Sequence, residues 1–454
     1  MDERNESAAL SSVECMLDAN SFVETGCHVH HNSAAFGLDN QTDGDGVLAG
    51  YGTIGSVPVY IYAQDINAFD GSVGEKNAEK IARIYDAAVK NGVPVISVLN
   101  SRGARLKEGV SALDGYAKIM KSAARAAGTV PRICVVTGPA IGAASVIAEM
   151  SDFVFVTEDA QLAATSPEVR KATYGEGIAL PANAYDIKGS IEEITAAISK
   201  LLTFIPLNSM EDAPVGDQSD DFNRVIAGTG DARTLIANAA DFGEFLELKK
   251  DACGSMITGF ARFGGFTAGI VANAENSKLD CAALAKAAGF ISYLDSFNIP
   301  VISLVDSTGF AYCNCEEEAG LSKRAAQLAY AYASSGMPMI TVLSGSAIGA
   351  AYSVMGSREL GADMVYAFKD AVVAPVEADL ASVLFYDELE GETREEKIAE
   401  YKDKYSNPMQ AAYNGSIDRI IEKSELRQML ISALMMQATK HSGEPLKRHG
   451  NLPL

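Results

Sequence analysis

Histidine is scarce in this sequence and missing from its middle. The 454 residues include 5 histidines, and these lie at positions 28, 30, 31, 441 and 449. Ser145, in the run Gly142-Ala-Ala-Ser-Val, could pass for a hydrolase nucleophile, but such a serine needs a histidine within hydrogen-bonding distance. A second run of the same kind carries Tyr352 in place of the serine. The sequence therefore argues against a serine hydrolase.

Positive charge and long apolar runs are also lacking. Lys and Arg total 37 against 59 Asp and Glu, so the net charge is −22. This balance argues against nucleic acid or an anionic membrane surface as a partner. No apolar stretch approaches the roughly 20 residues needed to span a bilayer, and the acidic N-terminus has no apolar signal region. We therefore expect a cytoplasmic protein whose positive contacts with any anionic substrate are local.

Cysteine occurs without the spacing of a disulfide framework or of a familiar metal site. Seven cysteines in so long a chain are expected to be reduced cytosolic thiols. Cys27-His28-Val-His30-His31 and Cys313-x-Cys315 offer metal ligands, but neither has a partner pair at a known spacing. Exposed loop residues are the simpler interpretation of both. Neither a dinucleotide-binding G-x-G-x-x-G nor a P-loop occurs, which argues against nucleotide hydrolysis.

Two similar glycine-rich runs are the most informative feature present. Gly138-Pro-Ala-Ile-Gly142-Ala-Ala-Ser145 follows an apolar segment at 133–137, and Gly345-Ser-Ala-Ile-Gly349-Ala-Ala-Tyr352 follows one at 339–343. Each run predicts a turn from a strand into a helix, where backbone N–H groups lack helical partners. Glycine and alanine let a ligand approach the main chain. The runs therefore predict two oxyanion holes that stabilise charge on carbonyl oxygens; a tightly packed turn is the alternative.

The remainder of the chain repeats at the same spacing as the two runs. Val93–Ala104 matches Ile299–Phe310, with Pro94 and Pro300 lying 206 positions apart, and Pro131 and Pro338 lie 207 apart. A repeat of this length is no solenoid unit and indicates a duplicated α/β domain. In the first copy the patterns predict strands at 57–63, 95–99 and 133–137 and helices at 78–91 and 116–127.

These patterns divide the chain into four parts. We expect an N-terminal helix and arm at 1–45, a first domain at 46–205, a linker and helix at 206–250, and a second domain at 251–454 that includes C-terminal helices. The segment 206–233 is rich in Asp, Gly, Asn and Pro, as linkers often are. The C-terminal helices are expected near 394–404 and 426–439, before a basic tail at 447–449.

A basic cluster lies in the loop after the strand at 95–99. Arg102, Arg105 and Lys107 form either a solvated loop or a local contact for a phosphate or carboxylate. Arg170 and Lys171, which follow Ser166-Pro-Glu, form a second basic cluster, for which the case for such a contact is weaker.

From about Gly50 onward the sequence resembles the carboxyltransferase subunits of biotin-dependent acyl-CoA carboxylases and decarboxylases, and propionyl-CoA carboxylase β subunits most of all. The matching segments are Phe69–Gly74, Ser101–Gly109, Gly138-Pro139, Val305–Phe310, Asn407-Pro408, Asp418–Ile421 and Lys447–Leu454. The resemblance implies an α/β fold of two tandem crotonase-like (ClpP/crotonase) domains, each a spiral of β-β-α units. It also implies a transferase that moves a carboxyl group between biotin and an acyl-CoA.

The resemblance implies a role for each glycine run. Gly142 and Ala143 would hold the thioester oxygen of an acyl-CoA as an enolate forms, and Gly349, Ala350 and Ala351 would hold the ureido oxygen of biotin as an anion. No protein base is needed, which agrees with the missing histidines, and no metal is implied. Further acyl-CoA-binding residues would be Ser101, Arg102, Gly103, Arg105, Gly138 and Ser166. Further biotin-binding residues would be Gly309, Phe310, Tyr352 and Ser353.

The resemblance further implies partners. Since the chain has no Met-Lys-Met biotinylation site, biotin would be bound to a separate biotin carboxyl carrier protein. A biotin carboxylase or a membrane decarboxylase subunit would complete the system, and the latter would bring the chain to the inner membrane face. The site would form between the first half of one subunit and the second half of another in a closed homo-oligomer, for example a hexamer built as a dimer of trimers or a trimer of dimers.

Some positions depart from the family pattern. Arg102 replaces a glycine, Ser353 replaces an acidic residue, and Ala311–Cys315 replaces a proline and a glycine. These changes leave the acyl group and the reaction direction open, so a decarboxylase α-type subunit is one alternative. A crotonase-type hydratase or isomerase, with Glu149 and Glu359 as acid and base, is another. A diverged subunit without catalysis is the third.

Overall fold

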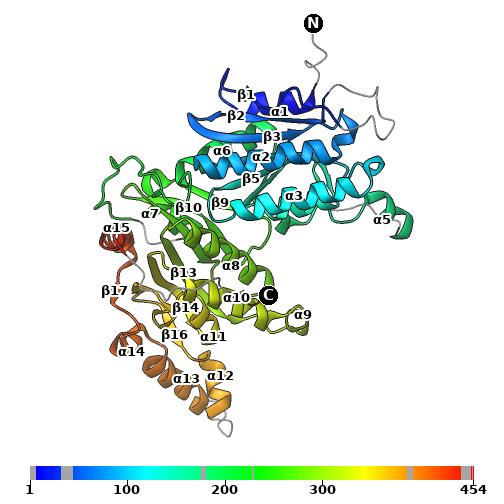
Figure 1. Cartoon of the computed structure of the whole chain (residues 1–454). Helices are drawn as coiled ribbons and strands as arrows, with labels where there is room; N and C mark the ends of the chain where they lie inside the picture. The colour runs from blue at the N-terminus through cyan, green and yellow to red at the C-terminus, as the bar shows by residue number, and fades with distance from the viewer. Residues whose placement is uncertain are drawn as a thin grey trace. The chain divides into compact units, whose positions relative to one another are not determined.

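The chain folds into two α/β units. The computed structural model describes residues 7–31, 44–174, 180–226, 230–385, 392–440, 451 and 453, so the expected basic tail at 447–449 lies outside the described residues. Internal contacts divide the chain into Met1–Glu211 and Asp212–Leu454 (Figure 1). Within the described part of the chain, no helix is both long enough and apolar enough to cross a membrane.

The first unit is built on one sheet with strand order β1-β2-β3-β4-β5-β6-β8, and β7 pairs with β5. β2 and β3 are antiparallel and joined at Gly55 and Ser56, which both have positive φ, as two-residue hairpins require. The strands are β1 (Val23–Glu24), β2 (Val47–Ile54), β3 (Val57–Gln64), β4 (Val95–Ser101), β5 (Arg132–Ile141), β6 (Phe153–Val156), β7 (Gln161–Ala163) and β8 (Ile187–Lys188). The helices are α1 (Ala8–Met16), α2 (Glu75–Asn91), α3 (Val110–Ala126), α4 (Ala143–Glu149), α5 (Pro167–Tyr174) and α6 (Ile191–Phe204), with 3₁₀ turns η3 (Phe69–Gly71), η4 (Leu106–Glu108) and η5 (Ala182–Ala184).

The second unit repeats this plan. Its strand order is β17-β15-β14-β13-β11-β10-β9, with β12 paired to β13 and β16 paired to β14. The strands are β9 (Phe245–Leu248), β10 (Met256–Phe263), β11 (Phe266–Asn273), β12 (Ser277–Leu279), β13 (Val301–Phe310), β14 (Met339–Ile348), β15 (Met364–Phe368), β16 (Val372–Ala374) and β17 (Arg419–Ile421). The helices are α7 (Ala232–Ala239), α8 (Cys281–Ser296), α9 (Asn314–Glu318), α10 (Leu321–Ser334), α11 (Gly349–Val354), α12 (Ala378–Phe385), α13 (Glu392–Tyr405), α14 (Pro408–Tyr413) and α15 (Leu426–Gln437), with 3₁₀ turns η6 (Asp241–Gly243), η7 (Arg358–Leu360) and η8 (Lys423–Glu425).

The duplication predicted from the sequence extends to buried details. A register shift interrupts the pairing of β4 with β5 between Leu99 and Ser101, and the same shift interrupts β13 with β14 between Val305 and Ser307. β4 is almost wholly buried and β13 is buried from Val301 to Val305, which is typical of parallel strands covered on both faces. The register shift thus recurs at the same point of both units.

The structure corrects two expectations about the glycine runs and the domain boundaries. β5 continues to Ile141 and β14 to Ile348, so Gly138 and Gly345 lie inside strands and the turns begin only at Gly142 and Gly349. The range 206–250, expected to be a linker with a helix, contains α7 and also β9, which pairs with β10 in the second sheet. The range 1–45, expected to be a helix and an arm, contains α1 and also contributes β1 to the first sheet.

Candidate functional site

Each unit has a glycine turn at the end of its longest parallel strand. Gly142 follows β5 and precedes α4, and Gly349 follows β14 and begins α11. Both have φ +65°, and a Cβ added to Gly142 would meet no atom within 4 Å. At Gly349 the nearest atom would be the carbonyl oxygen of Pro375, at 3.5 Å. Each turn therefore leaves space beside the main chain, as a ligand approaching the backbone requires.

The amides of the first turn are used unequally. The Gly142 N–H donates to the Ala163 carbonyl at 2.8 Å, so this amide is engaged within the chain. Ala143 is the first residue of α4, where an N–H has no partner inside the helix. The Ser145 hydroxyl donates to the Gly142 carbonyl at 2.7 Å, which fixes it in the turn. Of these two amides, the Gly142 N–H is thus used within the chain, while the Ala143 N–H lies at the start of the helix.

A serine after each register shift holds the neighbouring glycine loop in place. The Ser101 hydroxyl accepts from the Gly103 N–H at 3.2 Å, and the Ser307 hydroxyl accepts from the Gly309 N–H at 3.3 Å. Ser101 is fully buried. The Ser101 hydroxyl is therefore enclosed and used by its own loop, and its contact with substrate stays a prediction.

Gly138 also has a packing role. A Cβ at Gly138 would lie 2.5 Å from Oδ1 of Asn100, and one at Gly345 would lie 2.4 Å from the Asp306 carboxylate. Gly138 is buried in β5, and its contact with substrate stays a prediction. Because these two glycines have no side chain, they leave room for the side chains of Asn100 and Asp306, which extend from the neighbouring strand.

The polar side chains that cross beneath the turns differ in charge for a local reason. Asp306 Oδ1 accepts from the Ser346 N–H at 2.7 Å. In the first unit Pro139 stands where the second has Ser346, and proline has no N–H. Asn100 Oδ1 is buried and accepts no hydrogen bond from the described residues. A carboxylate at position 100 would have no N–H donor from residue 139. The neutral amide of Asn100 therefore suits the first unit, whereas the Asp306 carboxylate suits the second.

Asn100→Asp is expected to lower the free energy of unfolding by about 1–3 kcal/mol, because it replaces a neutral buried acceptor by a charged one that also lacks a donor. Adding Pro139→Ser should restore part of this loss, because the serine N–H supplies the donor seen in the second unit. Urea unfolding of wild type, the two single variants and the double variant gives the coupling between them. Strictly additive effects would contradict this explanation.

Arg105 and Arg102 lie in very different surroundings. The Arg105 side chain is 5% exposed and pairs with Glu108 at 3.1 Å. It donates to the carbonyls of Asp45 and Ser72 and stacks 4.2 Å from the centre of the Phe69 ring. Burial lowers the pKa of its guanidinium. The Arg105 donors therefore hold the loop to the rest of the unit, and a substrate contact at Arg105 stays a prediction.

Arg102 remains available for a ligand. Its side chain is 64% exposed, and its nearest acid, Asp70, lies 3.9 Å away and is exposed as well. Lys107 is also exposed, as are Arg170 and Lys171 on α5. The positive charge near the first turn is thus on Arg102 and Lys107, while Gly103 forms the buried, positive-φ backbone beside them.

The remaining predicted residues lie on the expected elements. The Ser166 carbonyl accepts from the Arg170 N–H at 3.1 Å at the start of α5. Phe310 ends β13, where it pairs with Leu279. Tyr352 is partly buried on α11, and burial followed by the Glu359 charge raises its pKa. Ser353 is exposed on the same helix.

The two candidate metal-binding runs have different outcomes. Among the described residues, Cys27–His31 does not form a group that could hold a metal ion, whereas Cys313, Cys315 and Glu316 lie close together. Cys313 and Cys315 are joined by a disulfide, which corrects the expectation that the cysteines are reduced thiols. Five other cysteines are free: Cys15, Cys27, Cys134, Cys253 and Cys281.

Comparison with known proteins gives consistent matches over nearly the whole chain. The carboxyl transferase domain family matches residues 2–183 and 187–452. The propionyl-CoA carboxylase beta chain of Cereibacter sphaeroides is 36% identical over 484 residues, covering 100% of this chain and 94% of the relative. The methylmalonyl-CoA decarboxylase subunit alpha of Veillonella parvula is 35% identical, covering 97% and 91%. The solved hexamer assembly of transcarboxylase 12S, with methylmalonyl-coenzyme A bound, superposes with a TM-score of 0.93 at 34% identity, covering 98% of this chain and 92% of that one.

Proposed function

The chain belongs to the carboxyl transferase domain family, and on that premise we propose that it moves a carboxyl group between biotin and an acyl-CoA. The observation that carries the proposal is the recurrence of one turn in both units. In each, a buried parallel strand ends at a glycine with φ +65°, with space beside it and a helix beginning at once. Two such turns suit a reaction that develops negative charge on two different oxygens.

The first turn would hold the acyl-CoA thioester oxygen. Removing or adding a carboxyl group at the α-carbon places negative charge on this oxygen as an enolate. The Ala143 N–H lies at the start of α4, where the helix dipole favours negative charge. A backbone donor aimed at such an oxygen is typically worth about 2.7–4 kcal/mol of barrier. Gly142 would contribute by leaving room for the thioester.

The second turn would hold the ureido oxygen of biotin. A Cβ at Gly309 would meet nothing within 4 Å, and Gly349 has similar freedom, so the backbone at Gly349, Ala350 and Ala351 fits a planar polar group approaching it. Biotin on a separate carrier protein would supply or take up the carboxyl group and the α-proton. Phe310, Tyr352 and Ser353 would line the approach, and the exposed Ser353 would influence the choice of acyl group.

The basic residues near the first turn would contact the anionic end of the coenzyme. Arg102 is exposed with a distant and exposed acidic neighbour, so it would lose little by turning to a phosphate. Lys107 is exposed on the same loop. This local charge would offset the net charge of −22 that otherwise repels CoA. Gly103 and Ser166 would border the same region.

The partners and the setting follow from this reaction. We assign acyl-CoA binding to the first unit and biotin binding to the second. The carboxyl group would come from or go to a biotin carboxyl carrier protein, served by a biotin carboxylase or by a membrane decarboxylase subunit. A cytoplasmic homo-oligomer, with a hexamer as the first expectation, would bring the first half of one subunit to the second half of another.

The test is to mix the purified protein with free biotin and methylmalonyl-CoA or malonyl-CoA and to measure CO₂ release and loss of the substrate. We expect biotin-dependent decarboxylation of at least one of these thioesters. Hydration of an enoyl-CoA without biotin would instead assign the chain to the hydratases and isomerases. Failure with every thioester, together with no binding of CoA or biotin by calorimetry, would leave a subunit without catalysis and overturn the proposal.

A further inference from the structure

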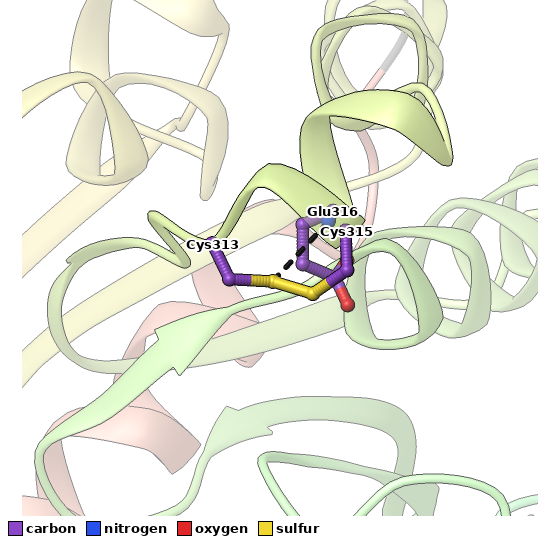
Figure 2. A group of neighbouring side chains, drawn as sticks. All are labelled: Cys313, Cys315 and Glu316. Atoms are coloured by element: carbon purple, nitrogen blue, oxygen red, sulfur yellow. Dashed lines mark hydrogen bonds between the residues drawn. A yellow bond between two sulfur atoms is a disulfide. The ribbon is translucent and has the colours of Figure 1, made fainter.

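A cysteine pair follows directly after β13 in the second unit. Cys313 caps α9 and Cys315 lies in its first turn, and a disulfide joins them (Figure 2). Both cysteines are exposed. The carboxyl transfer described above uses neither sulfur, so the pair needs a separate explanation.

Glu316 ties this pair to a third cysteine. Its N–H donates to the Cys313 sulfur at 3.3 Å, a contact that Figure 2 shows as a dashed line. Its Oε2 accepts from the Cys281 N–H at 2.7 Å, and its carbonyl accepts from the Cys281 thiol at 3.5 Å. Cys281 begins α8. A disulfide, a carboxylate and a free thiol therefore lie together.

We propose that Cys313 and Cys315 form a reversible dithiol–disulfide site that exchanges with low-molecular-weight disulfides that are uncharged or cationic. In the oxidising direction, a thiolate of the pair attacks the reagent disulfide, whose S–S bond breaks and releases one thiol. The second cysteine then attacks the mixed disulfide, which forms the Cys313–Cys315 bond and releases the second thiol. Two protons pass from the pair to the two released thiols, and the protein loses the two electrons that the reagent gains.

Exposure and loop length favour exchange over a structural role. A disulfide between residues two positions apart closes a very short loop, so it restricts the unfolded chain little. Both sulfurs can be reached from solvent, as attack by a thiolate requires. The N–H of Glu316 stabilises negative charge on Cys313, so reduction should begin by attack on Cys315 with Cys313 as the leaving group.

The charge around the pair selects the reagent. Glu316, Glu317 and Glu318 follow the cysteines directly, and the last two are exposed. These three carboxylates outnumber the two neighbouring cations, Lys278, which lies 4.1 Å from the centre of the Tyr312 ring, and Arg324, whose charge acts on Cys281. Acidic groups repel anionic disulfides such as oxidised glutathione and attract cationic ones such as cystamine. Oxidation of the reduced protein by cystamine should therefore be faster than oxidation by glutathione disulfide, and added salt should reduce the difference.

The site borders the segment assigned to biotin. The Ala311 N–H donates to the Leu279 carbonyl at 2.9 Å, and Leu279 pairs with Phe310. The Cys313 loop thus begins where the β12–β13 pairing ends, and Cys281 lies two residues beyond Leu279. The proposed exchange does not depend on this proximity and can be measured without any assay of carboxyl transfer.

The experiment uses the full chain in buffers of graded cystamine-to-cysteamine ratio, followed by acid quench, alkylation, trypsin and mass spectrometry. Cleavage at Lys278, Lys286 and Lys323 puts Cys281 on one peptide and Cys313 with Cys315 on another. We expect the peptide with Cys313 and Cys315 to carry two alkyl groups at a low ratio and none at a high ratio. When the ratio is lowered again, the two alkyl groups should reappear. Cys281→Ser should keep this behaviour, and Cys313→Ser should abolish it.

Three outcomes would overturn the proposal. Two alkyl groups at every ratio would mean that the disulfide does not form, and none at any ratio short of denaturation would mean that it does not exchange. Protection of the reduced pair that a chelator removes would assign Cys313, Cys315 and Glu316 to a metal ion, since their ligand atoms lie within 4.8 Å of one another.

Cys281 provides a reference in a separate experiment, in which the folded protein is alkylated at graded pH before digestion. Burial, followed by the Glu316 hydrogen bond, raises the pKa of its thiol to about 11. Only the thiolate is alkylated quickly, so Cys281 should be mostly unreactive at pH 8. Its labelling rate should rise about tenfold per pH unit and level off near pH 11. Fast labelling of Cys281 at pH 8 would show that its contacts with Glu316 are not maintained.

Discussion

Replacing Ala143 with proline is expected to reduce kcat for biotin-dependent decarboxylation about 10²–10³-fold, the usual cost of removing one oxyanion donor. Proline removes the N–H that the first turn presents and puts a ring methylene in place of its hydrogen. Because the Gly142 N–H is already donated to Ala163, the neighbouring amide cannot replace the lost donor. KM for the acyl-CoA should rise as well, because the ring occupies the space in which the thioester oxygen would lie.

The backbone at this position tolerates proline. Ala143 is the first residue of α4, and proline is favoured at the first position of a helix. Gly142 has φ 65° and ψ −126°, the mirror image of the extended conformation that residues before proline adopt. Thermal unfolding of Ala143→Pro should therefore stay within a few degrees of wild type.

Two matched variants control this prediction. Ala143→Gly keeps the N–H and should retain kcat within a few-fold. Ala350→Pro removes the corresponding amide near the start of α11 and should slow the same reaction by a similar factor if biotin is held there. A folded Ala143→Pro variant with normal kcat would exclude this amide as the oxyanion donor.

The duplication and the central elements of the first copy could be predicted because they depend on local patterns. Apolar runs gave the central strands, and the repeat spacing gave the second copy. The extension of β5 through Gly138-Pro139 was missed, because a Gly-Pro pair normally ends a strand. There the pairing of Pro139–Ile141 with β7 keeps the strand extended, and that pairing has no signal near Pro139 in the sequence.

The burial of two predicted site residues could not be foreseen from the sequence. Ser101 ends β4 and Arg105 lies in the loop after it, and polar residues at such a place are typical of binding sites. What buries them is distant in sequence: Arg105 donates to the carbonyl of Asp45, 60 positions earlier. Glu108 and Asp45, which complete this buried cluster, could not be found from spacing alone. The pair Cys313 and Cys315 was visible, but its disulfide was not predictable from the sequence.

Arg105→Met is expected to lower the free energy of unfolding of the first unit by about 3–5 kcal/mol, as does removal of one partner from a buried ion pair. Glu108, whose side chain is 2% exposed, would keep its charge with one donor fewer, although the Glu75 N–H would still donate to it at 2.7 Å. The loop that carries Gly103 would also lose its links to the Asp45 and Ser72 carbonyls. Activity should fall with the folded fraction, while KM measured well below the unfolding midpoint should stay near wild type.

Arg102→Met is the matched control, because it removes the same group three residues away. Its ion pair with Asp70 spans 3.9 Å between two exposed side chains and should contribute little to stability. A charged hydrogen bond to a CoA phosphate is worth about 1.5–3 kcal/mol, so KM for the acyl-CoA should rise roughly 10-fold to 100-fold with an unchanged unfolding midpoint. Measuring urea unfolding and KM for both variants separates the two roles. If Arg105→Met raised KM without loss of stability, or Arg102→Met lost stability with normal KM, the roles assigned to the two arginines would have to be exchanged.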